Sequence, residues 1–171
     1  YLNKVVLGGT DGSLQLWNVR TASLVHAFAA ADVRDGRAVG PGVVCLAQSP
    51  AMDVLAVAYA DGVVVLYDVR QGEVLFSVKV DGRLGARCVT FRTDGEAHTL
   101  AVATRTGAMV LFDLDAATDG GPRLLHSVQH AHDGPIGAVE FVPGQPLLVT
   151  TGADNAMKQW FFESPTPVSY T

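Results

Sequence analysis

Two side chains in the C-terminal part of the sequence, His132 and Asp154, are of the types that perform acid–base chemistry together. In a hydrolase, an aspartate orients a histidine, which activates a nucleophile in a cleft. The same two types can also form a structural hydrogen bond that ties a turn to a strand. No nucleophile, carboxylate pair or cofactor-binding loop emerges around them, so the sequence favours the structural interpretation and predicts no enzymatic activity.

A cluster of histidines overlaps this pair and could suggest a metal site. Its members are His126, His130 and His132. Beyond Asp133, no cysteine or further carboxylate joins them at the spacing of zinc ligands, so no metal is predicted. The glycine pairs at 8–9 and 120–121 match neither a phosphate-binding loop nor a dinucleotide fingerprint. They are interpreted as turns, and neither a cofactor nor a small-molecule substrate is predicted.

Composition and charge bound the classes to which the chain can belong. Of its 171 residues, 49% are apolar and 17% are charged, and the net charge is −5. These values are typical of a globular domain and argue against a surface built to neutralise phosphates, so any RNA contact is expected to be local or indirect. Apolar runs such as 54–60 have strand length and cannot cross a membrane. Glycine, valine and alanine outweigh aromatic residues, which favours an all-β fold.

One pattern occurs four times: a turn pair, apolar residues in alternation, and then an aromatic residue. It occupies residues 11–17, 61–67, 106–112 and 154–160. The aromatic residues recur about every 45 to 50 residues, which suits the four-stranded blades of a β-propeller. A sandwich or a barrel also has closely spaced strands, but neither requires the same aromatic at the same place in successive units. The repeat therefore predicts a β-propeller fragment.

Each unit is expected to contain four antiparallel strands, named a to d along the chain. Strand b precedes the turn, strand c carries the aromatic, strand d follows, and strand a opens the next unit. The predicted units are about 1–28, 43–80, 86–129 and 132–171, which gives three to four blades. The first unit begins at strand b, and the fourth has at most a stub of strand d near Tyr170. We therefore expect an open arc with unpaired edges that self-associates.

The two cysteines, Cys45 and Cys88, fall at equivalent places in neighbouring units. Blade sheets pack about 10 Å apart, farther than the roughly 7 Å that a disulfide allows. The sequence therefore predicts two buried free thiols.

The fourth unit resembles the hydrogen-bond network of WD repeats. In that network, a histidine bridges the aspartate of the b–c turn and a hydroxyl of strand b, and the hydroxyl meets the indole of a tryptophan on strand c. His132, Asp154 and Trp160 match three of these positions. The usual place of the hydroxyl, two residues before the aspartate, is Gly152, preceded by two threonines. The sequence leaves open whether the network is rerouted or incomplete.

The other three units keep parts of this pattern. Their turn aspartates are Asp11 and Asp61, and their strand-c aromatics are Trp17, Tyr67 and Phe112. Because the first two units lack the histidine, both aspartates are predicted to form plain turns. We expect the four strand-c aromatics to occupy one blade position.

Two connections are longer than a hairpin needs. The first, 29–42, joins strand d to the next strand a on the face that propellers use most for partners. A plain surface insertion is the favoured interpretation. Within it, Arg34, Asp35 and Arg37 are the candidates for partner binding. The second connection, 115–122, is expected on the opposite face and is assigned no function.

Several strings resemble one WD-repeat family in particular. They are Tyr-Leu-Asn-Lys at 1–4, Gly-Ser-Leu-Gln-Leu-Trp-Asn-Val at 12–19, Phe-Arg-Thr-Asp-Gly at 91–95 and Leu-Val-Thr-Thr-Gly-Ala-Asp-Asn at 148–155. These strings are similar to the WD-repeat subunit of the small-subunit processome, the nucleolar assembly that contains a small nucleolar ribonucleoprotein and processes pre-ribosomal RNA. The chain lacks the Trp-Asp pair itself, since asparagine follows Trp17 and phenylalanine follows Trp160.

This resemblance implies a fragment of the first of two tandem propellers, with a non-catalytic scaffold role in small-subunit pre-rRNA processing. It also implies location in the nucleolus, with other WD-repeat processome subunits and the small nucleolar ribonucleoprotein as partners. The alternative is a general WD-repeat adaptor in another complex, such as a ubiquitin-ligase substrate receptor or a signalling scaffold. Such an adaptor would have the same core and different faces.

Overall fold

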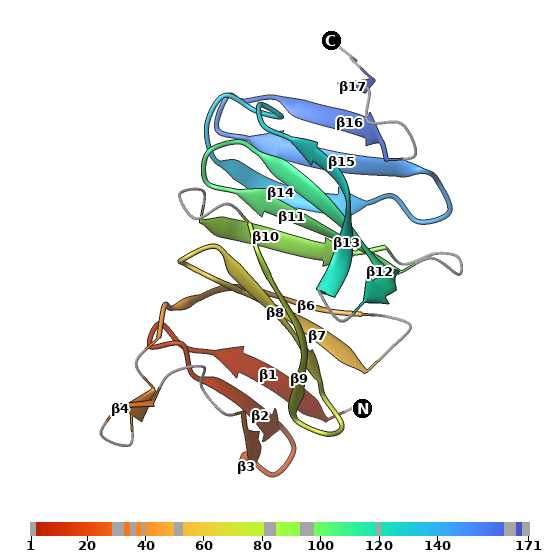
Figure 1. Cartoon of the computed structure of the whole chain (residues 1–171). Coiled ribbons are helices and arrows are strands. Elements are labelled where there is room, and N and C mark those ends of the chain that lie inside the picture. Colours follow the sequence, from red (N-terminus) through yellow and green to blue (C-terminus); the bar gives the residue numbers. More distant parts are fainter. Residues whose placement is uncertain are drawn as a thin grey trace.

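The computed structural model describes residues 3–28, 33–34, 37–38, 40–49, 53–80, 85–92, 98–118, 121–162 and 167–168. Every helix or strand in this part of the chain is a β-strand, which confirms the all-β prediction. Four antiparallel sheets follow one another along the chain as the blades of a propeller do (Figure 1). The described residues contain no helix long and apolar enough to cross a membrane.

Each sheet is a meander whose strands pair in chain order. The first sheet consists of β1 (Lys4–Gly8), β2 (Leu14–Asn18) and β3 (Ser23–Ala27). The second consists of β6 (Val43–Gln48), β7 (Val54–Tyr59), β8 (Val63–Asp68) and β9 (Glu73–Lys79). The third consists of β10 (Ala86–Phe91), β11 (Thr99–Thr104), β12 (Met109–Thr118) and β13 (Gly121–Val128). The fourth consists of β14 (Ile136–Phe141), β15 (Leu147–Gly152), β16 (Met157–Phe161) and the short β17 (Pro167–Val168).

The b–c turns explain the residue pair that opens each repeat. The second residue of the pair has a positive φ in all four units: 82° at Gly12, 88° at Gly62, 86° at Gly107 and 59° at Asn155. Glycine has no Cβ to clash in this conformation, and asparagine tolerates it better than most residues do. The recurring pair therefore fixes the tight hairpin between strands b and c.

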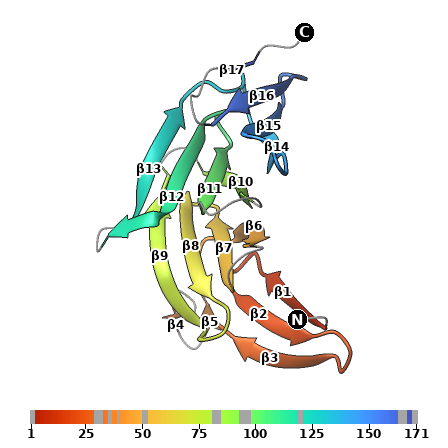
Figure 2. The same ribbon diagram turned by 90° about the vertical axis from the view of Figure 1, so that its right-hand side faces the viewer.

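Apolar side chains fill the gaps between successive sheets, which follow one another in a curved stack (Figure 2). Strands β7 and β11 lie inside the stack and are buried along their whole length, because a neighbouring sheet covers each of their faces. Side chains alternate across strand c, so Leu66 packs toward the third sheet and Tyr67 toward the first. Each strand-c aromatic of the last three sheets thus packs toward the preceding sheet.

A bulge recurs beside the strand-c aromatic. The register between strands c and d shifts at Leu16/Trp17, Leu66/Tyr67 and Leu111/Phe112. A bulge bends a strand and increases its twist. Because it stands at the same place in three sheets, it belongs to the repeated unit as much as the aromatic does.

The two long connections contain strands that the sequence analysis does not predict. The connection 29–42 is more than a plain loop, because it contains a two-stranded ladder of β4 (Val33–Arg34) and β5 (Arg37–Ala38). The connection 115–122 is mostly strand, because β12 and β13 lengthen their hairpin until Thr118 pairs with Gly121.

The cysteines also differ in part from expectation. Cys45 and Cys88 are free, as predicted, but they are half-buried rather than buried. The reason is their position on β6 and β10, each of which forms the edge of its sheet. Burial, together with the nearby Cys45, raises the pKa of the Cys88 thiol.

Candidate functional site

A continuous hydrogen-bond network joins four side chains of the fourth unit. His132 lies between β13 and β14, and its Nδ1 is 2.9 and 3.0 Å from the two carboxylate oxygens of Asp154. Its Nε2 is 2.7 Å from Thr150 Oγ1. The indole N–H of Trp160 donates to the same Thr150 oxygen over 2.9 Å. The structure thus brings His132, Asp154 and Trp160 together and routes the network through Thr150.

One set of donor and acceptor roles satisfies every member of this network. An indole N–H can only donate, so Thr150 Oγ1 accepts from Trp160 and can donate its own hydrogen to His132 Nε2. The remaining ring hydrogen then stands on Nδ1 and points at the Asp154 carboxylate. The described residues hold no buried side-chain nitrogen or oxygen without a partner.

Strand alternation selects Thr150 among the residues near the turn. Thr150 is fully buried and shares a face of β15 with Leu148, toward the third sheet, whereas Thr151 points to the other face and is exposed. At Gly152, a Cβ would come within 2.4 Å of His132 Nδ1 and 2.6 Å of Asp154 Oδ1. The imidazole therefore occupies the space that a side chain at 152 would need. The alternation of inward and outward residues is the sequence signal that distinguishes Thr150 from Thr151.

Asp154 is the polar centre of the b–c turn. Besides His132, it accepts hydrogen bonds from the N–H groups of Asp133 and Ala156, each at 3.2 Å. The hydrogen bond from His132 lowers the pKa of Asp154 to about 2, against the opposing effect of burial, and the two backbone donors add to the lowering. The turn is therefore bound both to its own hairpin and to the connection before β14.

A lysine that the sequence analysis does not single out strengthens the same connection. Lys158 Nζ donates to the carbonyl of Ala131 over 2.6 Å and lies 3.9 Å from an oxygen of Asp154. Lys158 pairs with Thr150 across β15 and β16, so it points to the face that carries the network. The sequence signal that could have identified Lys158 is a charged residue at an inward-facing position of strand c.

The turn aspartates of the first two units make fewer contacts. The carboxylate of Asp11 accepts the N–H of Ser13 over 3.0 Å, and that of Asp61 accepts the N–H of Val63 over 3.1 Å. The side-chain and backbone hydrogen bonds of Ser13 lower the pKa of Asp11. Among the bonds found in the described residues, the carboxylate of each of these aspartates binds only its own hairpin.

The other strand-c aromatics have different polar partners. The hydroxyl of Tyr67 is 3.3 Å from that of Tyr59, and burial raises the pKa of Tyr59. Phe112 is 8% exposed and packs in the apolar core between the second and third sheets. Trp17 is half-buried, and its indole N–H donates to Gln15 over 2.8 Å. The four aromatics share a register, but only Trp160 joins a histidine.

The side chain of His132 has 0% exposed surface, whereas that of Asp154 is 15% exposed. The ring of His132 links the connection before β14 to Thr150 of β15 and to the b–c turn at Asp154. Of the other clustered histidines, His130 is exposed and His126 is half-buried on β13. The described residues contain no group of three or more metal-ligating side chains.

The candidate partner-binding residues lie apart from this network. Arg34 and Arg37 are partners in the backbone register of β4 and β5, and Asp35 lies outside the described residues. The end of this connection contacts the first b–c turn, where the N–H of Gly40 donates to the carbonyl of Asp11 over 3.3 Å. The described end of the connection, at Gly40, therefore lies beside the first b–c turn.

Comparison with known proteins gives consistent matches. The family model of the WDR36/Utp21 first β-propeller matches residues 1–163. The chain is 38% identical over 164 residues to the U3 small nucleolar RNA-associated protein 21 homolog of Schizosaccharomyces pombe, covering 96% of the chain and 16% of that protein. It is 36% identical over 167 residues to human WD repeat-containing protein 36, covering 97% of the chain and 17% of that protein.

A solved structure of U3-55K has the same fold, with a TM-score of 0.78 at 16% sequence identity. The match covers 97% of this chain and 47% of that chain. The chain thus spans only 16% and 17% of the lengths of the two relatives above. Because the family model covers nearly the whole sequence, the chain belongs to the WDR36/Utp21 first β-propeller family.

Proposed function

We propose that this chain is part of a non-catalytic scaffold that supports small-subunit pre-rRNA processing within the small-subunit processome. One observation carries the proposal: the family model matches residues 1–163. Two relatives of the chain are named for their association with U3 small nucleolar RNA. We also propose that the whole protein resides in the nucleolus. Its partners there are other WD-repeat processome subunits and the small nucleolar ribonucleoprotein.

The physical properties of the chain support a scaffold. The sheets pack through apolar clusters, and the only described histidine–aspartate–threonine network is buried and joins elements of the fold. Neither a substrate nor a cofactor is part of the proposal. The net charge of −5 favours contacts with proteins over clamping of phosphates, so RNA contact is local or indirect.

The face that carries the b–c turns is the proposed partner face. Support comes from the end of the connection that contains Arg34, Asp35 and Arg37 in the sequence, because Gly40 binds the turn at Asp11. Charges at the rim of an interface usually change the association rate more than they change stability. We therefore assign the two arginines to partner recognition rather than to the core.

Purification of the tagged full-length protein from growing cells tests the main proposal. We expect enrichment of U3 small nucleolar RNA over a mock purification, co-purification of other WD-repeat processome subunits, and fluorescence of a tagged copy in the nucleolus. Recovery of ubiquitin-ligase or signalling subunits without this RNA would instead support the general adaptor.

Charge reversal at the connection tests the partner face. The double variant Arg34→Glu and Arg37→Glu should recover fewer processome subunits while keeping the circular dichroism of the native protein. Arg20→Glu, an exposed arginine after β2, is the matched control and should recover them normally. The assignment would be contradicted if the double variant were unfolded, or if it recovered as many processome subunits as the native protein does.

A further inference from the structure

Two arginines of the third sheet lie close together on the face of the b–c turns. Arg105 directly precedes the third b–c turn, and its N–H donates to the carbonyl of Gly85 over 3.1 Å. The stem of Arg105 passes the same residue, since a Cβ at Gly85 would stand 3.5 Å from its Cδ. Arg87 follows Gly85 by two residues, near the start of β10, and two residues of extended chain span only about 7 Å. The two side chains therefore flank Gly85.

Neither guanidinium is neutralised within the described part of the chain. Arg87 and Arg105 are both exposed, and among the described residues neither side chain forms a hydrogen bond or an ion pair. The second b–c turn lies beside them, since a Cβ at Gly62 would stand 3.6 Å from the nitrogen of Gly85. The carboxylate of Asp61 in that turn accepts an N–H of its own hairpin over 3.1 Å and pairs with neither arginine. Both positive charges are thus available to a ligand.

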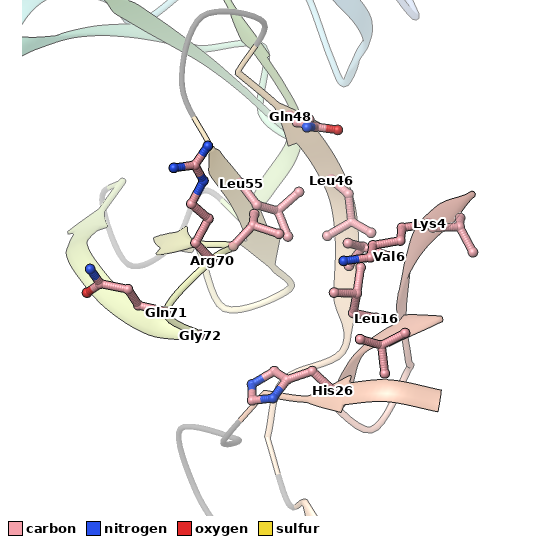
Figure 3. Close-up of a pocket in the computed structure, with 13 residues that line it drawn as sticks. Lys4, Val6, Leu16, His26, Leu46, Gln48, Leu55, Arg70, Gln71 and Gly72 are labelled. Carbon is pink, nitrogen blue, oxygen red and sulfur yellow. The ribbon is translucent and has the colours of Figure 1, made fainter. Parts of the chain in front are cut away.

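Two other arginines show the contrast, because each is paired within the fold. Arg70 stands at the mouth of a cavity of 710 Å³ between the first and second sheets (Figure 3), where it forms an ion pair with Asp53. Arg123 on β13 pairs with Asp113 over 2.8 Å. These two arginines bind carboxylates of the chain itself. The two arginines beside Gly85 have no such carboxylate among the described residues.

A short acidic segment is the ligand that this pair of charges fits. A guanidinium presents five donors in a fork, which matches the two oxygens of a carboxylate. Two arginines neutralise only about two phosphates, whereas proteins that clamp a nucleic-acid backbone make about six to ten such contacts. The net charge of −5 also opposes a long polyanion such as RNA. Charge complementarity therefore favours a few carboxylates over a phosphate backbone.

We propose that Arg87 and Arg105 bind a short acidic segment of a partner protein on the face of the b–c turns. In an extended segment, every second side chain points to the same side at a spacing of about 7 Å. Alternating carboxylates can therefore reach both guanidinium groups. This inference rests on the proposed function, because it places the contact on the proposed partner face, and it adds the chemistry of one partner there.

Fluorescence anisotropy with the full-length protein tests this proposal. The probe is a labelled eight-residue peptide of alternating Glu and Gly. We expect saturable binding that weakens as the salt concentration rises, because exposed charges are screened. The double variant Arg87→Gln and Arg105→Gln should bind about tenfold more weakly or worse. Arg20→Gln, the same exchange at an exposed arginine after β2, is the matched control and should bind as the native protein does.

A second probe tests the charges without any variant. The same peptide with Gln in place of Glu should bind the native protein about tenfold more weakly or worse. If the double variant loses the circular dichroism of the native protein, the two single variants replace it, and each should weaken binding. Absence of saturable binding at millimolar peptide, or equal affinity of the native protein and these variants, would overturn the proposal. An equal loss in Arg20→Gln, or tighter binding of an oligouridylate at the same arginines, would also overturn it.

The proposal can fail separately from the scaffold role. The peptide assay uses neither RNA nor other processome subunits. Absence of peptide binding, together with recovery of U3 small nucleolar RNA in the tagged purification, would overturn this inference alone. Absence of that RNA from the purification of the native protein would instead overturn the scaffold role.

Discussion

The first and fourth sheets carry nearly the same strand-c motif, but its tryptophan is buried in the fourth sheet and half-buried in the first. In the fourth sheet, Trp160 is 3% exposed and donates its indole hydrogen to a buried threonine. In the first sheet, Trp17 is half-buried and donates to Gln15, two residues before it on the same strand. The third sheet covers the face that holds Trp160, but among the described residues no sheet covers the corresponding face of the first sheet.

The second difference lies in the partners that other strands supply. Four residues before the turn aspartate, the fourth unit has Thr150 and the first unit has Leu7, which is 51% exposed. The first unit also has no counterpart of His132 in the sequence. The comparison teaches that the motif determines the turn and the strand, whereas the network depends on the histidine, the hydroxyl and the neighbouring sheet.

The largest expected effect separates the two tryptophans. Trp160→Ala should lower the free energy of unfolding of the 171-residue chain by about 3–5 kcal/mol, because it empties a buried aromatic site. Trp17→Ala should cost at most about 1–2 kcal/mol, because a half-exposed side chain removes less surface from water. Urea denaturation of both variants measures this difference. Equal losses, as the shared sequence register alone would predict, would contradict the distinction.

The network itself is tested at Thr150. Thr150→Val keeps the shape of the side chain but removes the oxygen that both His132 and Trp160 bind, so two buried groups lose their partner. The expected cost is about 1–3 kcal/mol for each unsatisfied group. Thr151→Val is the matched control, since Thr151 is exposed on the other face of β15 and should change stability by less than about 0.5 kcal/mol. Similar losses at both threonines would show that the hydroxyl is not essential.

The turn aspartates sharpen the comparison through pH. Hydrogen bonding lowers the pKa of Asp154 from 3.8 to about 2 in the folded chain. The stability that comes from this group is complete above pH 3.8 and is lost as the pH falls toward 2, because the unfolded chain takes up the proton first. Asp154→Asn should therefore flatten the decline of the urea midpoint over this range. Asp11→Asn should flatten it less, and the reverse order would contradict the assignment.

Features that repeat were predictable from the sequence. The four b–c turns and the common register of Trp17, Tyr67, Phe112 and Trp160 follow from residue types at a fixed spacing. A hairpin turn depends on local backbone preferences, so the residues that form it recur in each repeated unit. The register of the four aromatics therefore required no knowledge of the rest of the fold.

Features that depend on other segments were not predictable in the same way. The exposure of Trp17 depends on which sheet covers it, and the cavity between the first and second sheets depends on six segments at once. The extension of β12 and β13 brings together residues of two strands, such as Asp113 and Arg123, whose side chains lie 2.8 Å apart. Thr150 stands between these cases, because strand alternation identifies it once the position of β15 is known.

The smallest expected effect on stability concerns what the first and fourth sheets share. Each exposes an apolar face at one end of the stack, with Leu7 at 51% exposure and Met157 at 65%. Apolar faces of this kind favour self-association, so size-exclusion chromatography with light scattering should show oligomers of the 171-residue chain. The double variant Leu7→Lys and Met157→Lys should shift the distribution toward monomer with little change in melting temperature, because neither side chain is buried. Leu124→Lys is the matched control, since Leu124 is 55% exposed on the third sheet, inside the stack, and should leave the oligomers unchanged. A monodisperse native monomer, or an equal effect of the control, would show that the two end faces do not drive association.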